Sequence, residues 1–288
     1  MREAIGVDIG GTNVRVARVA ADGTVAEVRR APTPFGDVEA LVGVVAELHG
    51  GGDGPIGVGV AGGATADGTM CGAPNLGIDG EPFGQLLTAR LGRSATILND
   101  ADAATWAEFR LGAGSDVEHL LMLTLGTGVG GGAVVAGRLL RGATGLAGEF
   151  GHMVVAEGGA LCKCGNHGCL EAYASGSAMA MGDRRASDLA ADARDGDPVA
   201  TAHFTRIGNW LGIGMANLVN ALDPARIVVG GGAGTAAFDL VVPAAREALA
   251  ARLFGRPQRT PPPIVPAELG DDAGVVGAAL LAMEEVDL

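Results

Sequence analysis

The pattern of apolar positions along the chain predicts alternating strands and helices. An unbroken apolar run at 4–9 and an alternating stretch at 14–19 predict two strands joined by a turn at 10–13. Other short apolar runs predict strands at 24–29, 56–61, 95–98, 120–125, 132–140 and 227–230. Apolar residues at helical spacing predict helices at 41–48, 101–111, 207–222 and from 273 to about 288. Strands that alternate with helices are typical of the α/β fold class.

Both halves of the chain begin with the same succession of a strand, a turn rich in glycine and threonine, and a returning strand. Thr12 and Thr127 occupy equivalent points in the two successions. This similarity predicts an internal duplication of the architecture. We therefore expect an N-terminal lobe at 1–112, with the C-terminal helix packing back on it, and a C-terminal lobe at 113–272.

The charge balance excludes several classes of function. The chain has 33 acidic and 20 basic residues, and the resulting net charge of −13 disfavours binding to nucleic acid. Lys163 is the single lysine and lies between two cysteines. The mechanisms of P-loop NTPases, protein kinases and Schiff-base enzymes need a lysine, so these classes are excluded.

No segment has the character of a membrane span or a signal peptide. The longest uncharged run, 120–137, has glycines at its centre, where a turn would leave backbone groups unpaired in lipid. The first residues lead directly into a strand. We expect a cytoplasmic protein without membrane partners, in which Cys162, Cys164 and Cys169 suit a metal site better than disulfides.

Two glycine-rich turns are candidate phosphate sites, because glycine lets backbone N–H groups approach phosphate oxygens and threonine adds a donor. They are Gly10-Gly11-Thr12-Asn13 and Gly126-Thr127-Gly128. Asp8, beside the first turn, is a candidate ligand of Mg²⁺. The alternative for each turn is a hairpin that needs glycine for a positive φ. A dinucleotide site is disfavoured, because a strand and not a helix is predicted after Gly132.

Several motifs occur in the order found in one family of enzymes. They are Asp8-Ile-Gly-Gly-Thr-Asn13, Asn99-Asp100 at a helix start, Leu123-Thr-Leu-Gly-Thr-Gly-Val-Gly-Gly131, Glu149-Phe-Gly-His152 and Cys162-Lys-Cys-Gly-Asn-His-Gly-Cys169-Leu-Glu171. In this combination the chain resembles the ROK sugar kinases over nearly its whole length, and among them the bacterial ATP-dependent glucokinases. The resemblance implies an actin-like (RNase H-like) ATPase fold of two lobes with the active site in the interlobe cleft. It also implies transfer of the γ-phosphoryl group of ATP, with Mg²⁺, to the 6-hydroxyl of a hexose by a homodimer or homotetramer.

The resemblance also implies roles for individual residues. Asp100 would be catalytic and would align the attacking hydroxyl, although its position alone is typical of a helix-capping carboxylate. The hexose would contact Asn99, Asp100, Glu149, His152, Glu171, Gly63 and Asn75. The nucleotide would contact Asp8, Gly10, Gly11, Thr12, Asn13, Gly126, Thr127, Gly128, Gly230 and Gly231. Glu149 and Glu171 could alternatively be solvated surface residues. The turn at 230–231 could alternatively be a tight strand end.

The spacing Cys-x-Cys-x4-Cys supplies three soft ligands, and tetrahedral zinc needs a fourth. His152 is the fourth ligand by resemblance, and His167 within the loop is its rival. Four protein ligands leave no open position, so this zinc would be structural. By the same resemblance, His152 would contact zinc on one side and the sugar on the other.

Three other functions compete with glucose phosphorylation. A kinase for another hexose, such as fructose, mannose or an N-acetylhexosamine, would share the same hydroxyl-binding residues. A sugar-responsive repressor is disfavoured, because Asp8 lies almost at the start of the chain and the charge is negative. A polyphosphate-dependent kinase is disfavoured by the cysteines.

The role of Asp102, which often corresponds to asparagine in relatives, stays open.

Overall fold

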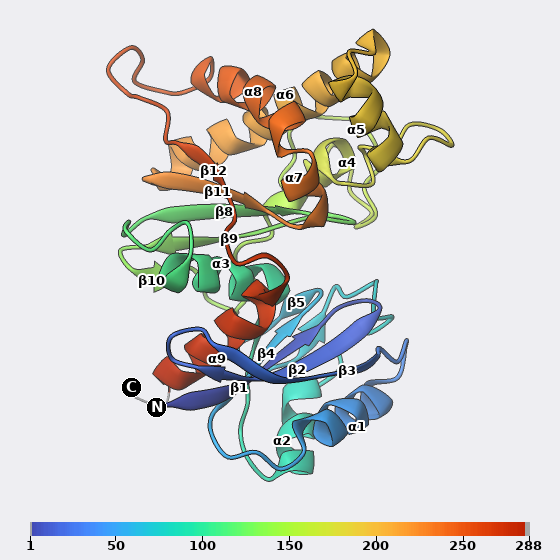
Figure 1. The fold of residues 1–288 in the computed structure, drawn as a ribbon, viewed down its shortest axis with the longest axis vertical. Helices are drawn as coiled ribbons and strands as arrows, with labels where there is room; N and C mark the ends of the chain where they lie inside the picture. The colour runs from blue at the N-terminus through green and yellow to red at the C-terminus, as the bar shows by residue number, and fades with distance from the viewer. Residues whose placement is uncertain (1, 286–288) are drawn as a thin grey trace. The chain divides into compact units, whose positions relative to one another are not determined.

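Two five-stranded sheets with the same strand order form the framework of the chain (Figure 1). The computed structural model describes residues 2–285, and each sheet lies in its own compact unit. The first unit comprises the chain up to Ser115, Leu139–Gly148 and the chain from Glu268. The second unit comprises Asp116–Arg138 and Glu149–Ala267.

The first unit contains the N-terminal sheet. Its strands are β1 (Glu3–Ile9), β2 (Asn13–Ala20), β3 (Val25–Pro32), β4 (Ile56–Val60) and β7 (Thr96–Asn99), in the order β3-β2-β1-β4-β7. A separate pair is formed by β5 (Gly63–Ala64) and β6 (Met70–Cys71). The helices are α1 (Val38–His49), α2 (Phe83–Leu91), α3 (Asp100–Leu111), η2 (Gly270–Asp272) and α9 (Ala273–Glu285). Because β1 pairs antiparallel with β2 and parallel with β4, the turn after β1 reverses the chain at the edge where β4 and β7 also end.

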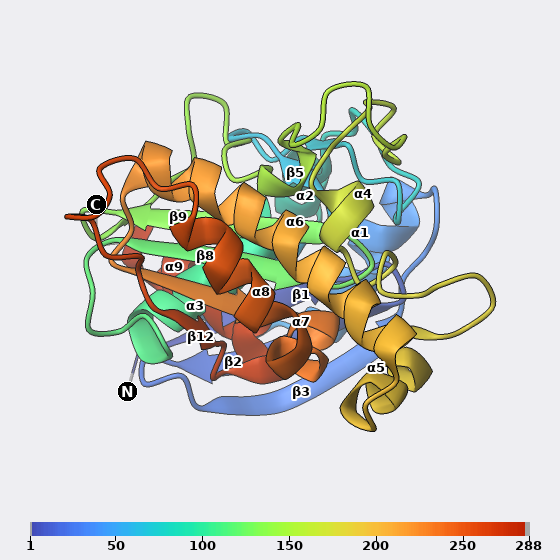
Figure 2. The same ribbon diagram turned by 90° about the horizontal axis from the view of Figure 1, so that it is seen from above.

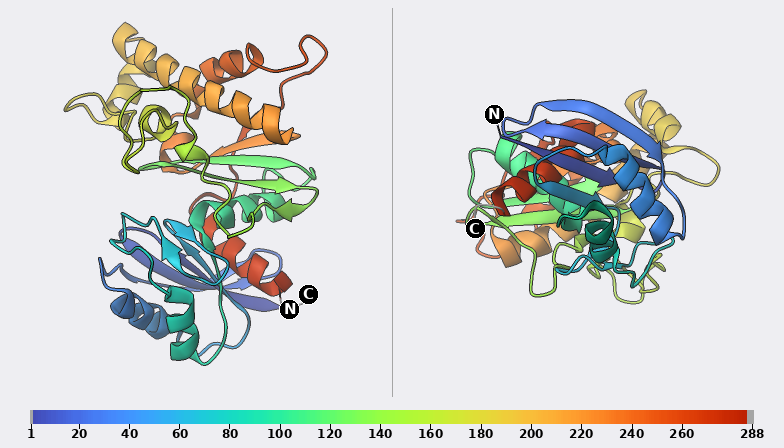
Figure 3. Two further views of the ribbon diagram at one scale, coloured as in Figure 1. Left: turned by 180° about the vertical axis from the view of Figure 1, so that it is seen from behind. Right: turned by 90° about the horizontal axis from the view of Figure 1, so that it is seen from below.

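The two faces of this sheet are packed differently. On one face, Val7 belongs to a buried core that includes Leu41 of α1 and Leu87 of α2. On the other face lies α9, as the front and back views show (Figures 1 and 3). A Cβ atom at Gly57 would lie 1.8 Å from the carbonyl oxygen of Ala278, so only glycine permits this close approach.

The second unit repeats this arrangement. Its strands are β8 (Leu120–Leu125), β9 (Val129–Val135), β10 (Arg138–Leu139), β11 (Arg226–Gly230) and β12 (Ile264–Pro266), in the order β10-β9-β8-β11-β12. The helices are η1 (Phe150–His152), α4 (Glu171–Ala174), α5 (Ala186–Arg194), α6 (Pro198–Leu222), α7 (Gly232–Ala236) and α8 (Phe238–Ala250). Figure 2 shows α6 crossing this sheet, and its core cluster contains Leu123, Leu211 and Val241. The matching strand orders agree with the expected duplication.

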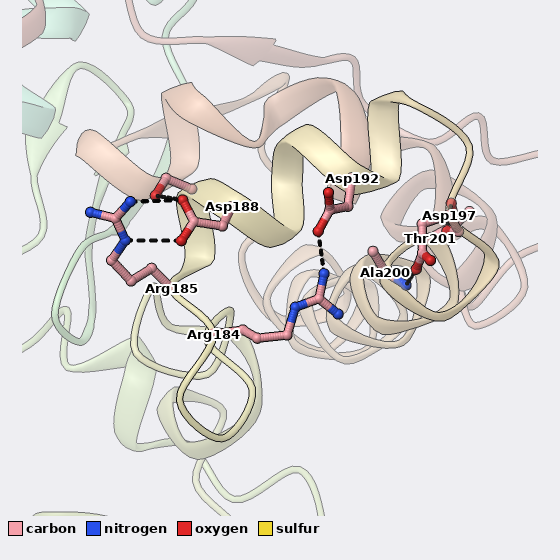
Figure 4. Close-up of polar contacts among 8 residues, drawn as sticks. Arg184, Arg185, Asp188, Asp192, Asp197, Ala200 and Thr201 are labelled. Carbon is pink, nitrogen blue, oxygen red and sulfur yellow. Dashed lines mark hydrogen bonds and ion pairs between the residues drawn. The ribbon is translucent and has the colours of Figure 1, made fainter.

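Polar contacts tie the residues before α5 to that helix and cap the start of α6 (Figure 4). The Arg185 guanidinium binds both carboxylate oxygens of Asp188 (2.9 Å each), and Arg184 pairs with Asp192. Asp197 caps α6 by accepting the N–H of Ala200 (2.7 Å). This cap starts α6 nine residues before the predicted position.

The structure differs from the sequence expectations at two further places. The strand predicted at 132–140 is interrupted by a turn at Ala136, which has φ 50°, and therefore divides into β9 and β10. Residues 139–148, expected in the second lobe, belong to the first unit, where the N–H of Ala66 donates to the carbonyl of Thr144 (2.8 Å). The C-terminal helix is described to Glu285, and its predicted extension over 286–288 lies outside the described residues. Among the described helices, none combines the length and apolar character needed to cross a membrane.

Candidate functional site

The first glycine-rich turn connects β1 to β2 in the first unit. The N–H of Gly10 donates to the carbonyl of Asn13 (3.0 Å), and the Thr33 hydroxyl donates to the carbonyl of Gly10 (2.7 Å). A Cβ atom on Gly11 would lie 3.2 Å from the Cβ atom of Asn75. The structure therefore brings predicted nucleotide contacts directly beside a predicted hexose contact.

Asp8 lies near the end of β1, next to this turn. A Cβ atom on Gly274, at the start of α9, would lie 3.1 Å from the Asp8 carboxyl carbon. Burial raises the pKa of Asp8 above its ordinary value, while Arg15 opposes this shift and the negative charge of Asp271 adds to it. A nearby cation would favour the ionised carboxylate, so this environment suits a metal-binding role.

Asn99 and Asp100 form the junction between β7 and α3. The Oδ1 atom of Asn99 accepts the N–H groups of Ala101 (2.8 Å) and Asp102 (3.3 Å), so Asn99 is the N-cap. Its Nδ2 atom donates to the carbonyl of Gly62 (2.9 Å), which fixes the residue before the predicted hexose contact Gly63 at the start of α3. Asp100 is the first residue of the helix, where the helix dipole favours an ionised carboxylate.

The second glycine-rich turn connects β8 to β9 in the second unit. The N–H of Gly126 donates to the carbonyl of Gly128 (3.0 Å), and the N–H of Gly176 donates to the carbonyl of Gly126 (2.8 Å). The Ser177 hydroxyl donates to the carbonyl of Thr127 (2.7 Å). The segment 175–177 thus supports the turn from outside the hairpin, so the turn does not depend on its own strands alone.

Gly231 places a third glycine-rich turn beside the second. It follows β11 with φ 77°, and a Cβ atom there would lie 2.5 Å from the carbonyl oxygen of Leu125. Leu125 immediately precedes Gly126, so the predicted nucleotide residues of the second unit, including Gly230, lie together. The helix α7 begins at Gly232, directly after the turn.

His152, Cys162, Cys164 and Cys169 form a cluster in which the ligand atoms lie within 4.8 Å of one another. The Sγ atoms of Cys164 and Cys169 are 3.8 Å apart, and the Nδ1 atom of His152 is 3.7 Å from the Sγ atom of Cys162. A tetrahedron with Zn–S distances of about 2.3 Å has edges of about 3.8 Å, so these residues fit a zinc ion. His167, the rival ligand, instead contacts the carbonyl of Gly159 through Nδ1 (3.0 Å).

The thiols of this cluster need a cation to be ionised together. Burial raises the pKa of the Cys162 thiol to about 12 and also raises the pKa of Cys169. A hydrogen bond from the backbone of Asn166 lowers the pKa of Cys164. Because zinc binds thiolates, a bound zinc ion would supply the charge that stabilises the two buried sulfur atoms.

His152 connects the cluster with two carboxylates. Its Nε2 atom lies 3.9 Å from Oε2 of Glu149, while its Nδ1 atom faces the cysteines. Glu171 accepts the N–H of Val129 through Oε2 (3.1 Å), and its Oε1 atom lies 3.5 Å from the Sγ atom of Cys162. Burial raises the pKa of Glu149, Glu171 adds to this shift, and His152 opposes it. These carboxylates and the imidazole form a set of acceptors suited to several hydroxyl groups.

Sequence reasoning missed two features that bear on the site. The Ser-Gly-Ser segment at 175–177 bonds to the second turn. In the sequence it is recognisable only as a group of small residues after the predicted site residue Glu171. Glu108, on α3, is fully buried and has backbone partners far along the chain. In the sequence, Glu108 stands out only as an acidic side chain within an alanine-rich predicted helix. Asp102, whose role stayed open, is 1% exposed and belongs to the packed side of α3.

The sequence and the fold of this chain are similar to those of one family of proteins. The model of the ROK family matches residues 4–285. The glucokinase of Streptomyces coelicolor is 36% identical over 97% of each chain, and the N-acetylmannosamine kinase of Shigella boydii is 34% identical over 98% of each chain. The crystal structure of a ROK family glucokinase from Streptomyces griseus, in complex with glucose and AMPPNP, has a TM-score of 0.83 and 34% identity. It covers 98% of this chain and 99% of its own.

The family match, the sequence identities and the structural similarity therefore agree with one another. These agreements extend over almost the whole length of the described structure, which has the actin-like α/β fold of ROK sugar kinases. The chain belongs to the ROK family.

Proposed function

We propose that this protein is a glucokinase, which transfers the γ-phosphoryl group of ATP to the 6-hydroxyl of glucose and forms glucose 6-phosphate and ADP. The observation that carries this proposal is the junction of β7 and α3, where Asn99 provides the cap and Asp100 begins the helix. The similarity to a glucokinase crystallised with glucose and AMPPNP supports the same assignment.

In this proposal, Asp100 accepts a hydrogen bond from the attacking hydroxyl and aligns it with the γ-phosphorus. A carboxylate kept ionised by a helix N-terminus is a weak base. Phosphoryl transfer tolerates a weak base, because its loose transition state requires little proton removal before the bond to ADP breaks. Alignment is therefore the main contribution of Asp100.

Hexose binding is assigned to carboxylate, amide and imidazole groups. Glu149 and the Nε2 atom of His152 lie close enough to share neighbouring hydroxyls of one sugar. Glu171 is placed beside them by its contact with Cys162. The remaining proposed contacts are Asn99, Asp100, Gly63 and Asn75, all carried by the first unit.

Nucleotide binding is assigned to backbone amides instead of lysine side chains. Gly10, Gly11, Thr12 and Asn13 would bind phosphate oxygens, and Asp8 would hold Mg²⁺ directly or through water. The other proposed contacts are Gly126, Thr127, Gly128, Gly230 and Gly231. The hydrogen bonds from Gly176 and Ser177 support this role, because they fix a turn that would otherwise have to be ordered by the ligand.

A structural zinc ion is assigned to His152, Cys162, Cys164 and Cys169. Its proposed task is to hold the imidazole of His152 through Nδ1, so that Nε2 is presented toward Glu149 and the sugar. A cytoplasmic location and a homodimer or homotetramer remain predictions that accompany this function.

A kinase for another hexose is the second candidate, and the identity of 34% to an N-acetylmannosamine kinase favours it. The test is the rate of ADP formation with glucose, fructose, mannose and N-acetylhexosamines, each with ATP or polyphosphate as donor. We expect the highest kcat/KM with glucose and ATP. A higher value with another sugar would replace glucose, and turnover restricted to polyphosphate would contradict the assignment of ATP.

A further inference from the structure

Glu108 is a buried carboxylate that has no part in the functions assigned above. It lies in the last turn of α3, and its side chain is 0% exposed. Its Oε2 atom accepts the N–H of Ala113 (2.9 Å), and its Oε1 atom accepts the N–H groups of Glu268 (2.9 Å) and Leu269 (2.8 Å). A buried carboxylate is tolerated when its oxygen atoms are bonded in this way.

The three donors flank two of the four points where the chain passes from one unit to the other. One passage follows Ser115, and another precedes Glu268. The carbonyl oxygen of Glu108 also accepts the N–H groups of Gly112 (3.1 Å) and Gly114 (2.9 Å), just before the first passage. One residue of α3 therefore binds chain segments that are about 155 positions apart in the sequence.

The surroundings of Glu108 leave it little freedom. A Cβ atom at Gly112 would lie 2.2 Å from its Oε2 atom, so the first passage fits against the carboxylate only because residue 112 is glycine. Behind the second passage, α9 packs closely on α3; a Cβ atom at Gly277 would lie 1.7 Å from the carbonyl oxygen of Ala103. The contact is thus built into the packing of the first unit.

We propose that Glu108 is a positioning residue that anchors both passages to the helix beginning with Asp100. Through its two oxygen atoms, Glu108 holds the residues next to both passages fixed relative to the proposed catalytic carboxylate. The consequence for turnover rests on the proposed kinase function, whereas the anchoring itself does not.

The test compares amide hydrogen exchange and steady-state kinetics in Glu108→Gln, Gly112→Ala and the control Thr105→Val. The amide group of glutamine can accept the Glu268 and Leu269 N–H groups, but it then presents an NH₂ group to the Ala113 N–H. Gly112→Ala keeps the carboxylate and displaces it by contact. Thr105 is also buried on α3, but its hydroxyl bonds only to the carbonyl of Ala101 in its own helix.

We expect exchange at 112–116 to increase by at least about tenfold in Glu108→Gln and Gly112→Ala, with the sheet cores as protected as in the wild type. We expect kcat to fall by about tenfold in both variants and to change less than about twofold in Thr105→Val. Unchanged exchange at both passages, or an equal increase throughout the first unit, would overturn the anchor. Locally increased exchange with wild-type kcat would overturn the positioning role. A wild-type protein without kinase activity would remove the proposed function, and the exchange comparison would still decide the anchor.

Discussion

At the scale of single residues, two neighbouring side chains at the start of α3 accept backbone N–H groups of the helix. The sequence alone favours a capping role for Asp100, but the structure gives that role to Asn99, whose Oδ1 atom accepts the amides of Ala101 and Asp102. The Oδ1 atom of Asp100 also accepts the N–H of Ala101 (2.8 Å), so Asp100 adds to the cap that Asn99 provides. The clustering of the cysteines with His152 was also predictable from spacing and resemblance, whereas the buried Glu108 was not, because its partners are distant in the sequence.

Glu149 is the residue that best separates sugar binding from nucleotide binding. Because it is assigned to hydroxyl groups of the bound hexose, Glu149→Ala should raise the KM for glucose by at least about tenfold and leave the KM for ATP within about twofold. Steady-state kinetics with each substrate varied in turn would measure both values. Glu118→Ala, at an exposed position of the same unit, is the control. An unchanged KM for glucose would contradict the assignment.

His49 should give the first unit a pH-dependent stability. Burial, Arg93 and Arg29 lower its pKa below the ordinary value of 6.5. As the pH falls, the unfolded chain therefore takes up the proton first, and the free energy of unfolding decreases below about pH 6.5 until the folded state is also protonated. Urea unfolding at pH 7.5 and 5.5 should show a smaller loss in His49→Gln than in the wild type. Equal losses would show that His49 is not responsible.

At the scale of elements, periodicity predicted most strands of the two sheets and the helices α1, α3, α6 and α9, whereas β12 and the helices α2, α5 and α8 were not predicted. Helix α8 contains Pro243, and α6 begins at a proline after the Asp197 cap, so their full lengths depend on capping and tertiary contacts. The division of the strand at 132–140 follows from the left-handed conformation of Ala136, which apolar character does not reveal. Helix α9 approaches the sheet closely at Gly6 and Gly57, where an added Cβ atom would clash with the backbone of Val275 and Ala278.

The contact between α9 and β4 predicts a large difference between two glycine substitutions. Gly57→Ala places a methyl group against the carbonyl of Ala278 and should lower the free energy of unfolding by about 2–3 kcal/mol or more. Gly43→Ala, inside α1 with no atom within 4 Å of the new Cβ, should raise it by about 0.5–1 kcal/mol. Chemical denaturation of both variants would measure these changes. A fully stable Gly57→Ala protein would show that α9 does not approach the sheet this closely.

At the scale of the whole molecule, two units of the same architecture carry different sets of candidate residues. The duplication was predictable from the recurring strand–turn–strand pattern, and the strand orders agree with it. The sequence assigned 139–148 to the second lobe, because a local pattern does not reveal that Arg141 bonds to the carbonyl of Ile97 in the first unit. The chain passes between the units at four points because segments such as 139–148 pack within the first unit.

Metal analysis and the KM for glucose together test the proposed link between the Cys₃His cluster and the sugar. Elemental analysis should find about one zinc ion per chain. Cys164→Ser should lose zinc and raise the KM for glucose, because the imidazole of His152 would no longer be held through Nδ1. Cys71→Ser, outside the cluster, should retain the metal. A metal-free protein that is folded and fully active would refute the assignment.

The proposed role of Asp100 is tested most directly by ADP formation in the wild type and Asp100→Asn at saturating glucose and ATP, with glucose affinity measured in parallel. Asparagine preserves the size of the side chain and removes its charge. The account predicts glucose-dependent ADP formation by the wild type and a fall in kcat of at least about 100-fold in the variant, with glucose binding largely retained. Near-normal turnover by Asp100→Asn would contradict it.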